Sequence, residues 1–498
     1  MRNWLREHST EIKLFFTIWL VYAVYVTPAG GVTPNRYVDL VHSIVNEGRF
    51  EIDTYHENTI DKAYYDGHYY AGALPGPSFL AVPAYVVFKG MYTLVPDVLK
   101  EMAGGIQSYK TNKLPESSFY GQVDNVEFFL SQAFLVVSTV AFFAALAGVF
   151  FYNTLKLMDV EDIVAFPLTF VFAFGTTLFW NATWFFEQAF TIFFALVAFY
   201  TIFRMRLAQF STTGLISGGF LAGCALLIEF SGAFVGLTLF LYVLMNYKKP
   251  KTLFYWLGFS IPVMILMFYN YSLFGNPFST PYQHLIGTEF QAIIEEGFVG
   301  VSYPRLDRFV GLLISPERGV LVFVPSTILG FAGLLIPSRL KSKHKNEAIL
   351  FSALAMTALL FVSSFKGWNA GGAFGPRYLM FGLPFMVIPV AFFVDNKKDR
   401  LQIAFFIGFL SILINWAGAQ YGFAENYYQH LENVMMKGPT LPIFEAIASH
   451  AVVSHPFFEF ITCHKSLLFG MTNLVLLGGI GALWLLPQFK KSLMRREI

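Results

Sequence analysis

The chain alternates long apolar runs with short polar connections over most of its 498 residues. The runs are roughly 17 to 27 residues long, enough for a helix to cross a hydrocarbon core about 30 Å thick. Segments of an outer-membrane barrel would alternate polar and apolar residues over about 10 positions, so that class is excluded. The pattern predicts an all-α polytopic membrane protein with about twelve transmembrane helices (eleven to thirteen), at 14–29, 126–152, 163–180, 188–203, 213–229, 232–247, 252–272, 319–337, 348–364, 378–394, 401–420 and 467–487.

A thirteenth apolar stretch, 72–96, is broken by Pro75, Pro77, Pro83, Lys89 and Gly90. If it lies on the membrane surface, the short Lys/Arg-rich connections fall on the side of the amino terminus. If it crosses, they fall outside, against the positive-inside rule. We therefore predict cytoplasmic termini and an amphipathic element at 72–96 on the outer face of the membrane. Labelling of a His68→Cys variant from outside intact cells checks this orientation.

The predicted connections between helices differ greatly in length, and one outer connection is much longer than the others. It comprises a cytoplasmic amino terminus (1–13), a retained first helix (14–29), an extracytoplasmic loop (30–125), a transmembrane bundle (126–487) and a basic cytoplasmic tail (488–498). Four further outer loops are predicted at 181–187, 273–318, 365–377 and 421–466. The first loop has no counterpart in the second half, which argues against an inverted-repeat transporter. We expect any chemistry on the outer face.

The composition and net charge argue against a soluble protein and against a nucleic-acid partner. Only 13% of the residues are charged and 55% are apolar, whereas about 25% charged residues is usual in soluble proteins. A net charge of +2 indicates no nucleic-acid partner. The two cysteines form neither a disulfide framework nor a metal-ligand spacing.

The first outer loop begins with a predicted short helix over 33–48, on which Asn35 and Asp39 share a face. Asp66-Gly67 then predicts a turn between two tyrosine-rich strands. Carboxylates orient sugar hydroxyls and aromatic faces stack on sugars, so this loop favours a sugar or phosphate site; the alternative is that its tyrosines only anchor the loop at the headgroups. The candidates here are Asn35, Arg36, Asp39, Asp53, Asp61, Lys62, Tyr64, Tyr65, His68 and Tyr69.

Charged residues also occur at the outer ends of later helices. Glu187 and Glu229 are acids at or near membrane depth, where a charge is costly, so each is a functional candidate; a structural ion pair is the alternative for Glu229. Arg377 follows a glycine-rich loop that contains Trp368 and begins a helix, a position suited to a phosphate. The alternative is an arginine that reaches the lipid headgroups. Arg318 belongs to a second basic set.

These segments together resemble the GT-C superfamily of membrane glycosyltransferases, close to the prokaryotic protein-O-mannosyltransferase and aminoarabinose-transferase type (glycosyltransferase family 39-like) and to an uncharacterised bacterial branch. The resemblance covers most of the chain and depends on the order and outer placement of several short motifs. They are Asn35-Arg36-Tyr37, Ile52-Asp53, the run 61–70, Leu74-Pro75-Gly76-Pro77, Phe174-Gly175-Thr176-Thr177, 271–277 and Phe374-Gly375-Pro376-Arg377-Tyr378. Where the family often has an acidic pair, this chain has Pro34-Asn35.

The resemblance implies a polyprenyl-phosphate-linked sugar as donor, attacked by an acceptor hydroxyl with inversion. Arg377, with Lys62 or Arg318, would stabilise the leaving phosphate. Asp53, Asp61 or Asp39 would accept the hydroxyl proton, and Glu187 would orient the acceptor or hold a cation. Carboxylates with water could bind Mg²⁺ or Ca²⁺, but no spacing requires a metal. The partners expected are this donor, a glycan, lipid or protein acceptor, and the bilayer; a flippase of the lipid-linked sugar and a glycan polymerase or ligase are the alternatives.

Overall fold

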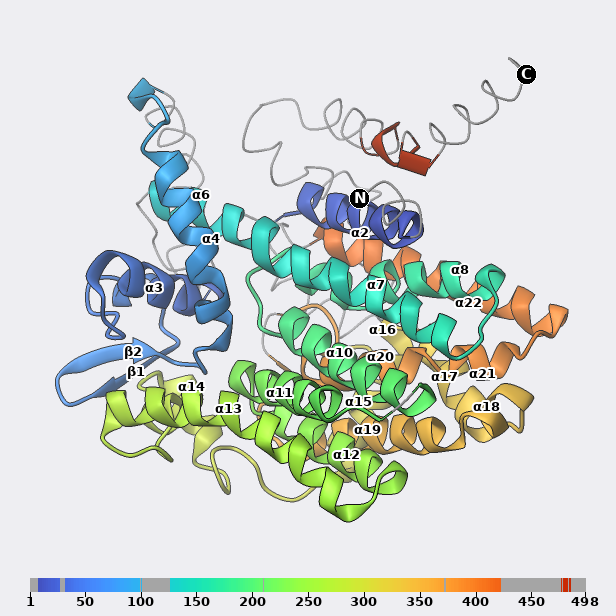
Figure 1. Cartoon of the computed structure of the whole chain (residues 1–498). Helices are drawn as coiled ribbons and strands as arrows, with labels where there is room; N and C mark the ends of the chain where they lie inside the picture. Colours follow the sequence, from blue (N-terminus) through green and yellow to red (C-terminus); the bar gives the residue numbers. More distant parts are fainter. Residues whose placement is uncertain are drawn as a thin grey trace.

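The computed structural model describes residues 8–26, 32–98, 100, 126–208, 210–370, 373–421, 476, 478–481 and 483–484. In these residues the regular structure is helical except for one antiparallel hairpin (Figure 1). The amino-terminal part contains α2 (Ser9–Val24), α3 (Val32–Glu47), η1 (His56–Asn58), β1 (Lys62–Tyr65), β2 (His68–Ala71) and α4 (Gly76–Tyr92). The predicted first span, 14–29, overlaps α2 at residues 14–24, and residues 27–29 lie outside the described part.

The remaining elements form the helical bundle. They are α6 (Val126–Leu135), η2 (Val136–Val140), α7 (Ala141–Leu157), α8 (Asp162–Phe174), α9 (Leu178–Asn181), α10 (Gln188–Leu207), α11 (Thr212–Ile228), α12 (Gly232–Asn246), α13 (Lys249–Phe274), η3 (Pro281–His284), α14 (Thr288–Ile294), α15 (Leu306–Ile314), α16 (Val320–Phe323), α17 (Ser326–Leu335), α18 (Arg339–Lys343), α19 (Lys345–Ser364), η4 (Arg377–Gly382), α20 (Leu383–Val387), α21 (Val390–Val394) and α22 (Lys398–Tyr421).

Six helices in the described part are long and apolar enough to cross a membrane: Glu127–Leu157, Gln188–Leu207, Pro250–Phe274, Lys345–Ser364, Arg377–Val394 and Lys398–Ala419. Four shorter apolar helices are Asp162–Phe174, Thr212–Ile228, Gly232–Asn246 and Ser326–Leu335. Nearly all of these coincide with predicted spans. The predicted loop 421–466, the span 467–487 and the tail 488–498 lie largely outside the described residues.

Some predicted spans are not single continuous α-helices. The span 378–394 is divided into η4, α20 and α21, and two others are 163–180 and 319–337. In 163–180 the helix α8 stops at Phe174, and its C-cap is Gly175, a residue type that is common at helix ends. In 319–337, α16 ends at Phe323 and α17 begins at Ser326, because Pro325 has no N–H for a helical hydrogen bond.

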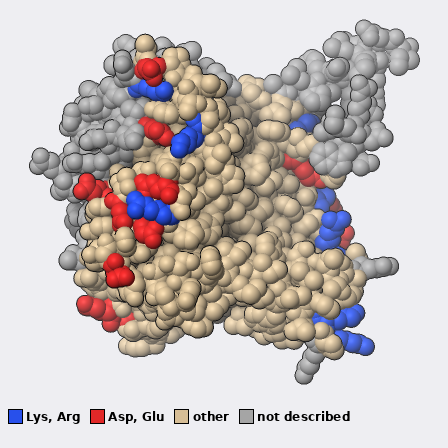
Figure 2. All heavy atoms as spheres, turned by 60° about the vertical axis from the view of Figure 1, so that its left-hand side comes forward, with Lys and Arg blue, Asp and Glu red and all other residues tan. Residues whose placement is uncertain are grey.

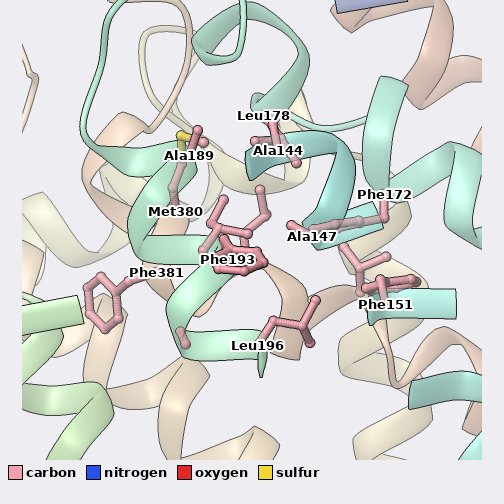
Figure 3. Packing of buried hydrophobic residues seen from close by; sticks show 14 of the residues in the cluster. Ala144, Ala147, Phe151, Phe172, Leu178, Ala189, Phe193, Leu196, Met380 and Phe381 are labelled. Carbon is pink, nitrogen blue, oxygen red and sulfur yellow. The ribbon is translucent and has the colours of Figure 1, made fainter. Parts of the chain in front are cut away.

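The bundle interior is packed with aromatic and small side chains. Phe151 of α7 stacks on Phe172 of α8 with ring centroids 4.3 Å apart, and Ala144 and Ala147 lie on the same side of α7 facing α10 (Figure 3). Gly219 of α11 lets α13 approach closely, since a Cβ there would lie 1.9 Å from the carbonyl oxygen of Tyr255. Small residues at helix contacts are typical of membrane bundles.

The outside of the bundle is apolar as well. Leu253, Leu257, Met264 and Phe268 of α13 are 69%, 54%, 56% and 67% exposed. A helix that presents such a stripe fits lipid, because these side chains gain nothing from contact with water. Charged side chains are instead gathered at a few places, most densely on one side of the molecule, while wide areas are uncharged (Figure 2).

The segment predicted as the first outer loop contains the predicted helix and hairpin in its described residues, whereas 101–125 lie outside the described part. The helix α3 covers the stretch 33–48, and the hairpin turns at Asp66 and Gly67, whose φ angles of 50° and 89° are the left-handed pair of a two-residue turn. The element at 72–96 contains α4, which packs on α3 and α6. The hairpin and α3 lie at one end of the molecule (Figure 1), and β1 contacts η3, so parts of two predicted outer loops meet there.

Candidate active site

A cavity of about 920 Å³ opens where the segment 32–61 meets the ends of several bundle helices. Most of its wall is aromatic or aliphatic, including Trp180, Phe186, Phe234, Phe298 and Phe365. Such an apolar enclosure with a few convergent polar groups is the usual form of a small-molecule site. Five charged side chains line it: Arg36, Asp61, Glu187, Glu229 and Arg377.

Arg36 joins two of the carboxylates. Its Nη1 lies 2.5 Å from Asp61 Oδ2, and its Nη2 lies 3.6 Å from Glu187 Oε1. All three side chains are nearly buried, with 7%, 5% and 6% exposed. The pairing offsets the cost of removing these charges from water, so the carboxylates can stay inside an apolar wall.

The segment that leads to Asp61 is held against α3. Asn35 donates to the carbonyl of Asn58 (2.7 Å), and Thr59 Oγ1 donates to the carbonyl of Val32 (2.7 Å) while accepting from the N–H of Asp61 (3.0 Å). These bonds place Asp61 beside Arg36, one turn after the start of the helix. The arrangement needs a residue without Cβ at Gly72, where a Cβ would lie 2.6 Å from Asp61 Oδ1.

The two other acids are connected by an amide. Gln188 Nε2 donates to Glu187 Oε1 (2.9 Å) and to Glu229 Oε2 (3.4 Å), and Ser231 Oγ donates to Glu229 Oε1. Glu187 Oε2 is buried without a hydrogen-bond partner among the described residues. The turn before α10 and the turn after α11 therefore bring both carboxylates to one wall.

Arg377 at the start of η4 is the second cation of the cavity. Its guanidinium lies over the rings of Phe186 and Tyr378, 4.8 and 5.1 Å from their centroids, and its Nη2 donates to the Tyr378 hydroxyl (3.4 Å). The residue is 7% exposed, yet no carboxylate of the described chain lies within 4 Å of its nitrogens. A nearly buried guanidinium without a carboxylate partner is suited to an anionic ligand.

The pKa values of Asp61 and Glu187 shift in opposite directions. Burial raises the pKa of Asp61 above its ordinary value, and the charge of Arg36 only partly opposes this. Burial acts in the same sense on Glu187, but Arg36 and Arg377 outweigh it and lower the pKa of that carboxyl. Asp61 is therefore the stronger base, and Glu187 stays ionised as a fixed negative charge.

Asp53 and His68, two predicted site residues, lie on the exterior of the hairpin. Asp53 accepts from the N–H of Tyr69 (2.7 Å) and pairs with His68 Nδ1 (2.8 Å). Partial burial acts to raise the pKa of Asp53, but the hydrogen bonds from Tyr69 and His68 outweigh it and lower this pKa. The contact with Asp53 raises the pKa of His68. Tyr64 and Tyr65 are 46% and 37% exposed and lie outside the cavity wall.

Lys62 also points away from the cavity, although it follows Asp61 directly. Its Nζ donates to the carbonyl of His56 (2.6 Å) and lies over the ring of Tyr69, which stacks on His56 at 4.0 Å. Asp39 is fully buried and accepts from Asn58 Nδ2 (3.0 Å). These contacts are structural ties within the first loop.

The remaining predicted residues support the cavity from outside. Asn35 is buried behind its wall and accepts from Gln132 Nε2 (3.2 Å). Arg318 is buried and donates to the backbone carbonyls of Asn369 and Ala373, so it holds the loop before Arg377. Trp368 packs against Gly311 of α15 and does not line the cavity.

Several wall residues were not singled out by the sequence. Ser231 lies two residues after the predicted Glu229, and that proximity was a usable signal. Tyr282 comes from the middle of the loop 273–318, where no sequence signal marked it. In the described part of the chain, no group of three or more His, Cys, Asp or Glu side chains is arranged to hold a metal ion.

Comparison with known proteins gives structural neighbours only. No family model and no curated protein matches the sequence. The fold is similar to that of ArnT from Cupriavidus metallidurans bound to undecaprenyl phosphate, with a TM-score of 0.49 and 12% identity over 93% of this chain and 77% of that one. It is also similar to the archaeal oligosaccharyltransferase AglB from Archaeoglobus fulgidus in complex with an inhibitory peptide and a dolichol-phosphate, with a TM-score of 0.49 and 12% identity over 88% and 60% of the two chains.

Proposed function

We propose that the protein transfers a sugar from a polyprenyl-phosphate-linked donor to an acceptor hydroxyl in this cavity, on the extracytoplasmic face. The observation that carries the proposal is Arg377, a nearly buried cation without a carboxylate partner in the described residues, in the same cavity as the Arg36–Asp61–Glu187 cluster. Arg377 would bind the donor phosphate. The apolar wall at Phe234, Phe298 and Phe365 would receive the first prenyl units.

The proposed reaction is a single displacement at C1 of the sugar. The acceptor oxygen forms a bond to C1 as the bond between C1 and the phosphate oxygen breaks, which inverts the configuration. The acceptor proton passes to Asp61, and the polyprenyl phosphate leaves as an anion stabilised by Arg377. Arg36 holds Asp61 Oδ2, while Oδ1 forms no hydrogen bond with the described residues. Glu187 would orient the acceptor.

The direct test uses the purified full chain in lipid nanodiscs with radiolabelled polyprenyl-phosphate sugars, both hexose and pentose, and cell-envelope extract as acceptor source. We expect free polyprenyl phosphate to appear together with label in a new product. In sealed vesicles, labelled lipid that crosses the bilayer uncleaved would favour the flippase alternative. Uncleaved donor under all conditions with folded protein would refute the transferase.

Transfer should depend on pH through Asp61. The proton acceptor must be ionised, so the rate should rise with pH through the pKa of this carboxyl, and burial places that rise above the ordinary value of 3.8. The positive charge of Arg36 lowers the Asp61 pKa, so Arg36→Gln should move the rise to still higher pH. Rates measured across pH for both proteins check this; an unmoved profile in Arg36→Gln would assign the base elsewhere.

Gly72 lies so close to Asp61 that a larger residue at position 72 should displace this carboxylate. In Gly72→Ala the new methyl group would meet Asp61 Oδ1 and its carbonyl oxygen at 2.6 and 2.7 Å. Displacing the carboxylate should lower the transfer rate by up to about a hundredfold. Gly90→Ala in α4, where nothing lies within 4 Å, is the control and should keep the full rate. A Gly72→Ala protein with normal activity would show that the position of Asp61 is unimportant.

A further inference from the structure

Tyr282 reaches the cavity from the outer segment 273–318, far in sequence from the first loop. It lies in η3, which begins with a capping box: Thr280 and Gln283 bond reciprocally, with the N–H of Thr280 donating to Gln283 Oε1 at 3.0 Å. Pro281 occupies the first turn, where its fixed φ suits a helix start. The short helix is thus locally well defined, and its tyrosine has a fixed direction of approach.

The segment around Tyr282 is bound to the hairpin that follows Asp61. Leu285 forms an antiparallel bridge with Ala63, and the N–H of Ile286 donates to the carbonyl of Lys62 (3.3 Å). The ring of His284 contacts that of Tyr65 at 4.9 Å. Backbone pairing this close to Asp61 sets the distance between the two segments, so Tyr282 is positioned relative to that carboxylate.

The ring and the hydroxyl of Tyr282 have different surroundings. The ring packs against Phe230, another wall residue, with centroids 5.4 Å apart. The hydroxyl lies in the field of Arg36, Glu187 and Asp61, and burial raises its pKa, so it stays protonated. It forms no hydrogen bond with the described residues, and its oxygen is not sealed from the cavity. A neutral donor is therefore open at the ionic centre.

We propose that Tyr282 is a substrate-positioning residue whose hydroxyl donates a hydrogen bond to a hydroxyl oxygen of the transferred sugar. The inference rests on the proposed function and extends it to one contact. Tyr282 lines the cavity together with Arg36, Asp61 and Glu187, and its segment pairs with the hairpin directly after Asp61, so we place its hydroxyl where the sugar would lie beside the proposed base. The phenol ring, anchored on Phe230, would orient C1 toward the acceptor.

The test compares Tyr282→Phe with the wild type in two measurements. Removing one hydroxyl should lower kcat/KM for the lipid-linked sugar about tenfold, the effect of one lost neutral hydrogen bond. Affinity for bare polyprenyl phosphate, which has no sugar, should be unchanged. Tyr303→Phe in the same outer loop, at a residue 72% exposed and outside the cavity wall, is the matched control and should behave as wild type.

The outcomes separate this inference from the proposed function. Unchanged kcat/KM in Tyr282→Phe with an active wild type overturns the sugar contact and leaves the transferase intact. An equal loss of affinity for bare polyprenyl phosphate also overturns it, because the residue then serves the phosphate or the fold. A wild-type protein that leaves every donor intact refutes the transferase itself, and the inference with it.

Discussion

Asp61→Asn is expected to slow sugar transfer by at least about a hundredfold, the low end of the contribution of a general base. The amide keeps the size of the side chain and can still accept from Arg36 Nη1, which lies 2.5 Å from Oδ2 in the wild type. It cannot take the acceptor proton. The loss should therefore appear in kcat, measured as release of polyprenyl phosphate at saturating donor, with a wild-type thermal melting profile.

Asp53→Asn is the matched control, since Asp53 is also an acid of the first loop but lies outside the cavity wall. Its amide oxygen can still accept from the N–H of Tyr69, so its activity should stay within about twofold of wild type, in line with an exposed substitution. If Asp53→Asn is the slow variant and Asp61→Asn is fast, the assignment of the base is wrong.

Arg377→Gln is expected to lower kcat/KM for the donor roughly a hundred- to thousandfold, comparable to the loss of one oxyanion-stabilising group. The substitution removes the positive charge that would bind the phosphate in the ground state and stabilise it as it leaves. Arg377→Lys should recover part of the rate, because the charge returns without the planar pair of donors. Binding of bare polyprenyl phosphate, measured by native mass spectrometry, should weaken in the same order.

Lys62→Gln is the control for Arg377, as a cation of the first loop that lies against His56 and Tyr69. It should leave donor affinity within about threefold, since an exposed or partly exposed charge acts weakly through water. Equal losses in Lys62→Gln and Arg377→Gln would mean that general positive charge, and not the guanidinium in the cavity, holds the donor.

Much of the architecture followed from local pattern. The two-residue turn at Asp66-Gly67, the helix over 33–48 and most of the long apolar helices are set by residues close in sequence, through turn propensity and helical periodicity. The breaks at Gly175 and Pro325 were missed because an apolar window of the right length hides a single residue that ends a helix.

The candidate site was predictable in its residue types but not in its membership. Asp61 and Lys62 are adjacent, yet only Asp61 lines the cavity, since neighbouring residues in extended chain point to opposite sides. Asp53 and Asp61 looked equivalent in the sequence; the one is tied to the exterior of the hairpin, and the other is paired with Arg36. Tyr282 arrives through backbone pairing with the hairpin, which no local pattern encodes.

The sequence by itself determines that this is a helical chain with long apolar helices and a polar first loop. These properties follow from the order of apolar runs, the turn residues and the placement of charges, because they depend on near neighbours and on the free energy of moving side chains out of water. Which acids and arginines share a cavity was decided only by the tertiary structure. The contact of Arg36 with Glu187 joins segments more than a hundred residues apart, and its energy depends on the burial that packing creates. Packing also leaves Arg377 in the cavity without a carboxylate beside it in the described residues.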